Sequence, residues 1–367
     1  MLFALVRALP VVALPILGLG ASGFSPALQE FRQETAVSYL SKDGLPTGPI
    51  RFVHVGRDAT PFAFTEGQWY NLQKGRWRLV PALSARSDAE FVFPLTREEH
   101  VTVPVPWRSV RWFAARNDSV CVASATNVVV VVQGHMSTLE LPQGFQLANA
   151  TMSEKGQIAV AGGGGLLELQ RNAWSRVAAE DSLGRRWAVR DVSCAGFDPN
   201  GCLWFGTKGG VGCRGAEGWR FYDGQRGLPW NDFTSIAFAP NGDVWFGTRL
   251  GAIRFDGRDF HYRQGPRWLP SDVVHHIAVA ADGAAWFATD AGVGCIVGRR
   301  MTLAEKAAFY ENEIERYIRR TPFGYVAEAA LRIAGDKSSA DPHDSDNDGL
   351  WTAMYGAGEC FAWAATG

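Results

Sequence analysis

The sequence predicts an all-β protein, a β-propeller of six to seven four-stranded blades, followed by a short α-helical segment. Two observations predict the propeller: a repeat of 41 residues and, inside each repeat, short apolar stretches separated by tight turns. A change of period after Met301 predicts helix at the C-terminal end. We expect a signal peptide at 1–23, a propeller at 30–300 and a helical segment at 301–367 that is the truncated beginning of a further helical domain.

The repeat is clearest around three tryptophans. Trp204, Trp245 and Trp286 stand 41 residues apart, and each is followed by Phe, a small residue and Thr. A fixed period near 40 residues indicates a propeller or a solenoid. These indoles fall in the same strand of each repeat, so we expect them to fill the blade cores rather than to stack on sugars.

One period also contains the four strands that a blade needs. The apolar stretches lie at 234–238, 244–248, 252–255 and 260–263. The dipeptides Asn241-Gly242 and Asp256-Gly257 between them suit tight turns, because both residue types tolerate positive φ. Four short antiparallel strands make one propeller blade. Toward the N-terminus the repeat weakens, and residues 73–110 are the least clear.

The order of these landmarks resembles the two component regulator propeller family. The matching residues are Gly227-Leu228-Pro229, Trp245-Phe246-Gly247-Thr248, Gly251 and Phe255-Asp256-Gly257. The resemblance covers about residues 38–298 and is strongest in the last three blades. It implies the propeller fold, and it implies a periplasmic sensing role in signalling proteins that respond to polysaccharide fragments.

Composition excludes some partners and suggests a compartment. The chain has 36 Lys and Arg against 37 Asp and Glu, so it lacks the excess of positive charge that nucleic acid or an anionic membrane surface would require. An apolar run at 8–19 follows Arg7 and precedes Gly20-Ala21-Ser22-Gly23, which is typical of a cleaved export signal. We therefore expect a periplasmic or secreted protein with no membrane span apart from that segment.

Export would permit disulfides, but the six cysteines form no CxxC pair. Cys194 and Cys202 flank a turn and could face each other across a hairpin. The alternative is that both are small buried residues in strands.

The C-terminal segment changes to helical spacing. Thr302 and Glu305 form a capping box, and apolar residues recur from Leu303 to Ile318 at intervals of three and four. A second helix is expected at about 350–365 and is apolar around most of its circumference, so it requires burial or a partner. Self-association through this helix is one outcome. The segment also looks similar to the opening helical hairpin of (α/α) toroids.

A possible calcium loop precedes that second helix. Asp344, Asp346 and Asp348, followed by Gly349, copy the first half of a D-x-D-x-D-G loop. The twelfth position is Tyr355 instead of a bidentate Glu. A solvated loop with Asp348 as a helix cap and an acidic loop facing a substrate are the alternatives.

The candidate ligand-binding residues lie where the last blades depart from their template, in loops that enter the inner strand. They are Trp230, Asn231 and Asp232 in one blade, and Trp268, Ser271, Asp272 and His275 in the next. Exposed indoles beside amides and carboxylates suit carbohydrate, because the ring stacks on the sugar while the polar groups fix its orientation. Ordinary surface loops are the alternative.

Two functions remain open from sequence. The first is a non-catalytic binding or sensing propeller whose ligand is a glycan or another extracellular polymer. The second is the N-terminal part of a carbohydrate-active enzyme whose catalytic (α/α) toroid lies mostly beyond residue 367. No G-x-S-x-G motif is present, and no catalytic residues are assigned.

Overall fold

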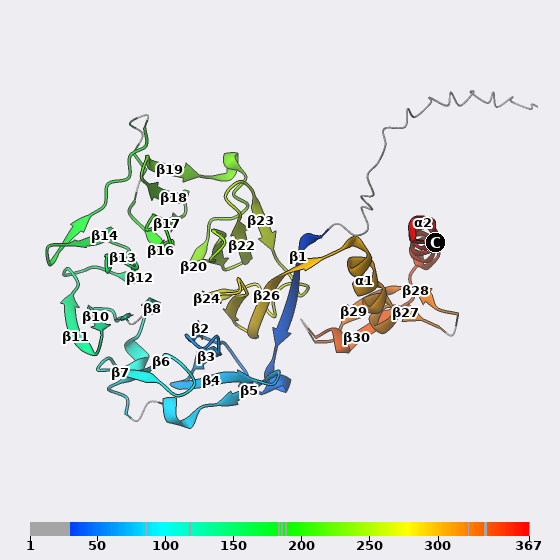
Figure 1. The fold of residues 1–367 in the computed structure, drawn as a ribbon, viewed down its shortest axis with the longest axis horizontal. Helices are drawn as coiled ribbons and strands as arrows, with labels where there is room; N and C mark the ends of the chain where they lie inside the picture. Colours follow the sequence, from blue (N-terminus) through cyan, green and yellow to red (C-terminus); the bar gives the residue numbers. More distant parts are fainter. Residues whose placement is uncertain are drawn as a thin grey trace, which may run out of the picture.

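The computed structural model describes residues 30–84, 87–116, 119–182, 184, 186–187, 189–321, 323–333 and 336–366. The expected signal peptide lies outside these residues. Within them, six four-stranded antiparallel sheets form a ring, which confirms the all-β propeller and sets the number of blades at six (Figure 1).

The first three blades follow the chain from the inner to the outer strand. Blade 1 contains β2, β3, β4 and β5 at Phe52–Val55, Pro61–Thr65, Gln68–Gln73 and Arg76–Leu79. Blade 2 contains β8, β9, β10 and β11 at Trp112–Arg116, Ser119–Ala123, Asn127–Val132 and His135–Glu140. Blade 3 contains β12, β13, β14 and β15 at Leu147–Met152, Ile158–Gly162, Gly165–Gln170 and Ala173–Arg176.

Blades 4 to 6 carry the clear sequence repeat. Blade 4 contains β16, β17, β18 and β19 at Val192–Phe197, Leu203–Thr207, Gly210–Gly215 and Gly218–Tyr222. Blade 5 contains β20, β21, β22 and β23 at Phe233–Phe238, Val244–Thr248, Gly251–Phe255 and Phe260–Arg263. Blade 6 contains β24, β25, β26 and β1 at Val274–Val279, Ala285–Thr289, Gly292–Met301 and Phe31–Tyr39. Short 3₁₀ turns η2 to η6 lie at Ser41–Asp43, Pro81–Leu83, Trp107–Ser109, Gly224–Arg226 and Lys337–Ser339.

The ring closes through its N-terminal strand. β1 pairs antiparallel with β26 along its whole length, from Phe31 opposite Met301 to Tyr39 opposite Val293. Blade 6 therefore takes three strands from the end of the propeller and its outermost strand from the beginning (Figure 1). The last strand of the propeller, β26, is thereby paired with the first strand, β1.

A hairpin between blades 1 and 2 explains the unclear stretch of sequence. β6 (Phe91–Pro94) and β7 (His100–Val103) form a sheet of two strands. Phe91 and Phe93 are fully buried in one aromatic cluster with Phe64 and Phe113. The Trp69 indole donates a hydrogen bond to the Val92 carbonyl at 2.7 Å. The hairpin therefore fills the space between two blades without forming a blade of its own.

The three repeat tryptophans occupy the places expected for them. Trp204, Trp245 and Trp286 lie in β17, β21 and β25, the second strands of blades 4, 5 and 6, and all three are buried. Trp245 packs with Phe287 of the next blade at a ring distance of 5.3 Å. The sequence repeat is thus a repeat of core packing.

The C-terminal segment differs from the expected helical hairpin. α1 (Leu303–Tyr317) begins at the predicted capping box, and α2 (Asp348–Thr366) lies close to its expected place. Two β-hairpins separate the helices, and their strands are β27 to β30 at Arg319–Arg320, Tyr325–Val326, Glu328–Leu331 and Ala340–His343. The (α/α) toroid interpretation is therefore not supported. Strands of two to four residues are too short to leave a periodic signal in the sequence.

α2 is partly covered on one side, near its N-terminal end, where Trp351, Thr352 and Tyr355 are half-buried. Trp351 donates to the Glu328 carboxylate at 3.3 Å, and the Tyr355 ring lies 4.6 Å from the Arg319 guanidinium. On the other side Met354 and Phe361 are exposed, Phe361 to 78%.

No helix among the described residues combines the length and the hydropathy that crossing a membrane requires. All six cysteines are free thiols, and the Cys194–Cys202 disulfide is not formed.

Replacing Trp245 by Ala should lower the free energy of unfolding by about 3–5 kcal/mol, because the surrounding blades cannot close the cavity that the indole leaves. Urea unfolding of the two proteins measures the difference. Phe323→Ala, at a side chain that is 84% exposed, is the control and should leave the midpoint unchanged. A loss below about 1 kcal/mol for Trp245→Ala would contradict the packing role.

We also propose that the exposed side of α2 mediates self-association, since apolar patches of this kind drive association. Phe361→Glu should shift the protein toward monomer in analytical ultracentrifugation over a range of concentrations. Phe323→Glu, equally exposed but in the loop between β27 and β28, should sediment like the parent. A parent protein that stays monomeric at all concentrations would refute this proposal.

Candidate functional site

Strand direction gives the propeller two different faces. The connections into each inner strand and the turns between the second and third strands lie at the same end of the blades. We call this end the loop face; in blades 4 to 6 it includes residues 208–209, 223–232, 249–250, 264–273 and 290–291, together with the connection from β15 into β16. The opposite end, the turn face, contains the turns between the first and second strands. All candidate ligand-binding residues belong to the loop face or, like His275, adjoin it.

The loop that carries Trp230 is fixed to both of its neighbours. The Asn231 amide donates to the backbone carbonyl of Lys208 in blade 4. The Asp232 carboxylate forms ion pairs with Lys208 and, at 3.7 Å, with Arg249 of blade 5. Trp230 itself remains 40% exposed. An aromatic side chain is therefore presented to solvent on a segment whose adjacent residues are constrained.

The equivalent loop of blade 6 is ordered mainly by hydrogen bonds among its own residues and by one backbone hydrogen bond to blade 5. The Asp272 carboxylate accepts from the Gly265 amide at 2.7 Å, and its backbone carbonyl accepts from Gly251 at 2.6 Å. The Ser271 hydroxyl accepts from the Val273 amide at 3.3 Å. The Asp272 side chain thus forms a hydrogen bond within its own loop, whereas the Asn231 side chain forms one with the preceding blade.

Trp268 has a different environment from Trp230. Its ring lies 4.5 Å from the Arg263 guanidinium on the outermost strand of blade 5 and 5.3 Å from that of Arg267. Arg267 in turn donates to the Tyr310 hydroxyl of α1 at 2.9 Å. The indole is half-buried and also packs against the core between blades 5 and 6. Its contacts are those of a packing residue at the junction of blades 5 and 6, and Arg267 connects this junction to α1.

His275 was predicted from the sequence, but it also belongs to a periodic set of bulge residues that the sequence analysis did not recognise. The inner strands of blades 4, 5 and 6 each carry a β-bulge, and the extra residues are Ser193, Thr234 and His275, spaced by 41 residues. Bulges re-aim a side chain next to binding sites. His275 Nε2 lies 2.7 Å from the Asp290 carboxylate, so the imidazole has a fixed orientation. The period of 41 could have grouped these three residues, but the bulge itself leaves no signal in a single sequence.

The central channel is narrow. Most of the side chains along it are apolar, but polar atoms make up the larger part of its exposed lining. It has a volume of about 210 Å³ and is lined by the six inner strands, with small side chains at many positions. Two histidines line it: His276 on β24 is buried, and His54 on β2 is half-buried. Burial lowers the pKa of each imidazole to about 3, and for His276 the neighbouring His54 adds to the effect. Both side chains are therefore neutral at physiological pH.

Calcium binding at Asp344, Asp346 and Asp348 stays a prediction. Asp344 and Asp346 are exposed, and Asp348 accepts hydrogen bonds from the backbone amide and hydroxyl of Ser345 at 3.2 Å at the start of α2. Among the residues that the structure describes, no three His, Cys, Asp or Glu side chains converge as metal ligands would. These hydrogen bonds of Asp348 fix the turn that enters the helix.

Comparison with known proteins supports the fold and one repeat. The model of the two component regulator propeller family matches residues 227–249, one entry loop with its inner strand and second strand. No curated protein matches the sequence.

Several solved structures share the propeller. An extracellular domain assigned to a hybrid two component system of B. thetaiotaomicron has 13% identity and a TM-score of 0.56, over 85% of this chain and 46% of that one. A second such domain has 13% identity and a TM-score of 0.52, over 72% and 40% of the two chains. Virginiamycin B lyase from Staphylococcus aureus has 11% identity and a TM-score of 0.53, over 73% and 99%. This chain spans less than half of the two extracellular domains, and at these identities the likeness shows the fold alone.

The two channel histidines predict acid lability. The unfolded chain binds protons on His54 and His276 below pH 6.5, while the folded protein does not until about pH 3, so stability falls as the pH drops through this interval. His276→Ser, which copies Ser235 one repeat earlier, should reduce the loss of unfolding free energy between pH 7 and pH 5 by about 2 kcal/mol. The exposed His100→Ser is the control. Equal pH slopes for the parent and His276→Ser in urea unfolding would refute the assignment.

Proposed function

We propose that this chain is a periplasmic or secreted binding propeller with a sensing role, whose ligand is a glycan or another extracellular polymer. The observation that carries the proposal is the exposed Trp230 indole on a loop that Asn231 and Asp232 fix to blades 4 and 5. A rigid aromatic surface loses little entropy on binding, and the neighbouring Lys208 and Arg249 supply hydrogen-bond donors for hydroxyl groups.

The comparisons support this assignment of class. The matched family model describes a regulator propeller, and two of the similar structures are extracellular domains of hybrid two component systems. We expect the ligand to contact the loop face of blades 4 to 6. We include Trp230, Asn231, Asp232, Asp272 and His275 in that surface, and Trp268 at its outer edge.

The channel favours surface recognition over uptake into the ring. Its lining side chains leave about 210 Å³, and its two imidazoles are neutral and surrounded by aromatic rings, Trp112 being 4.5 Å from His276. A polymer is too large for such a space. The exposed loops, which project away from it, can contact several units of a chain at once.

Trp230→Ala should weaken binding on a glycan array and in calorimetry with the best-bound glycan by about tenfold, the scale of a central aromatic contact. The melting temperature should stay nearly unchanged because the indole is not part of a blade core. Trp268→Ala is the matched variant: it removes another indole from the same face, and its packing predicts a clear loss of stability. If Trp230→Ala binds every parent ligand with parent affinity, the ligand site lies elsewhere.

A further inference from the structure

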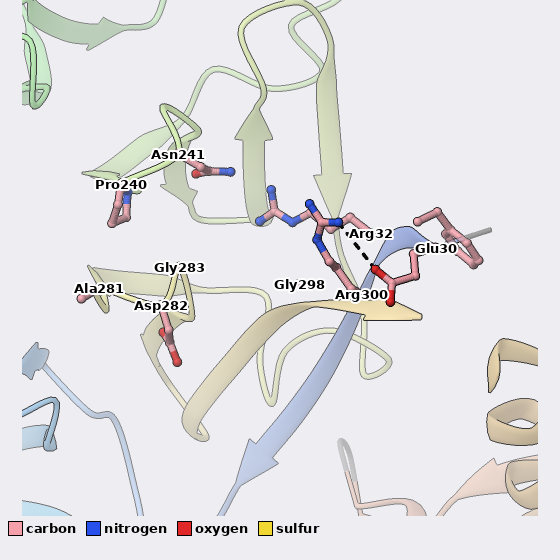
Figure 2. A pocket seen from close by; sticks show the side chains of 10 residues that line it. Glu30, Arg32, Pro240, Asn241, Ala281, Asp282, Gly283, Gly298 and Arg300 are labelled. Carbon is pink, nitrogen blue, oxygen red and sulfur yellow. Dashed lines mark ion pairs between the residues drawn. The ribbon is translucent and has the colours of Figure 1, made fainter. Parts of the chain in front are cut away.

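A pocket on the turn face lies where the ring closes. It has a volume of about 420 Å³ and is bounded by the first turns of blades 5 and 6 and by the paired ends of β1 and β26 (Figure 2). The turn at 239–243 stands at the opposite end of blade 5 from Trp230, because one strand length separates the two. The pocket is therefore independent of the proposed ligand surface.

Two arginines face this pocket from adjacent strands. Arg32 on β1 and Arg300 on β26 are direct partners in the antiparallel pair, so both side chains lie on the same face of the sheet. Like charges placed directly opposite each other destabilise a strand pair. This placement requires negative charge nearby to offset the repulsion.

The buried acids behind Arg32 are already shared with other arginines. Asp243 Oδ2 accepts from Arg32 at 3.0 Å and from Arg254 at 3.1 Å. Glu34 pairs with Arg254 and with Arg263. Three guanidinium groups thus face two carboxylates in one connected network. The side chain of Arg32 is 40% exposed and is the end of the network that opens on the pocket.

The acids that line the pocket do little to neutralise it. Arg300 lies 3.6 Å from Glu30, and the two side chains are 83% and 58% exposed, so solvent screens the pair. The Asp282 carboxylate accepts from the Ala284 amide at 2.9 Å and points away from both arginines (Figure 2).

Two further residues shape the pocket for an acceptor. Asn241 Oδ1 accepts from the Asp243 amide at 3.3 Å, which leaves the Asn241 amide nitrogen directed toward the arginines (Figure 2). A Cβ at Gly298 would stand 2.3 Å from Arg32 Nε, so any other residue here would displace the Arg32 guanidinium from the place that it holds across β26.

We propose that this pocket binds an oxyanion, a carboxylate, sulfate or phosphate group, through the guanidinium groups of Arg32 and Arg300 and the amide of Asn241. Planar guanidinium groups match the oxygen pairs of such anions, and charge-assisted bonds of this kind are among the strongest in proteins. The bound anion adds to the negative charge that Asp243 and the exposed Glu30 supply to the opposed arginines, and it connects blade 5 to the closing strand pair.

Calorimetry on the full chain tests the site with three probes, inorganic sulfate, inorganic phosphate and glucuronate, at constant ionic strength set by sodium chloride. We expect at least one probe to bind, and Arg300→Gln to weaken it about tenfold, the scale of one charge-assisted contact. Asn241→Asp, which keeps the Oδ1 acceptor and replaces the donor by a negative charge, should abolish binding. The strongest probe identifies whether a sugar acid or an inorganic anion is the better ligand.

Arg299→Gln is the matched control. It removes the same charge one residue earlier on β26, where the register partner is Gln33 and alternation places the side chain on the other face of the sheet. It should bind like the parent. Equal losses for Arg299→Gln and Arg300→Gln would show a diffuse charge effect and overturn the proposal, as would a folded parent that binds none of the three probes.

Discussion

The pairing of β1 with β26 is the constraint on which the propeller depends. Five blades are built from consecutive strands, but blade 6 is complete only when Phe31–Tyr39 returns to the last strand of the ring. The contact is reinforced between blades, since Glu34 and Arg32 of β1 join the ionic network around Arg254 and Asp243 of blade 5. Removing one member would leave a buried charge without its partner, which is far more costly than losing an exposed pair.

Contacts between neighbouring blades also hold the ring together. The inner strands of neighbouring blades are linked by side chains that satisfy backbone amides of the next strand. Asn149 accepts from Ala195, and Ser235 accepts from Ile277. Between blades 1 and 2 the β6–β7 hairpin adds aromatic rings behind the inner strands, and Arg51 donates to the Val110 carbonyl across the same junction. The insertion stabilises the junction where the sequence repeat is weakest.

Sequence analysis predicted the features that recur in every repeat, and it missed the features that occur once. Trp204, Trp245 and Trp286 gave the period, and core packing at equal intervals is a local property that a single chain displays. The closing strand was not foreseen, because its partner lies about 260 residues away and pairing over that distance leaves no local pattern. The β27–β30 hairpins were missed because strands of two to four residues are too short to show an alternation of apolar and polar residues.

The candidate site shows the same division. The entry loops were identified because they depart from the repeat, and the structure places Trp230, Asn231 and Asp232 on an exposed, well-anchored loop. Sequence could not show that Trp268 lies against Arg263 and Arg267 instead, since an indole in a loop looks the same whether it faces solvent or a neighbouring strand. Nor could it reveal the arrangement of Arg32 and Arg300, which depends on β-sheet register.

The loop face and the turn face suit different ligands because their connections differ in length. At the loop face each blade contributes a long entry connection, which tolerates a change of sequence without disturbing the four strands. At the turn face the connections are tight turns such as Asn241-Gly242, whose φ of +90° at Gly242 restricts the residues allowed. Variation for recognising a large ligand is therefore available at the loop face. A small anion needs only donors at fixed positions, and the turn face supplies these because its backbone is constrained and its charges belong to the network that closes the ring.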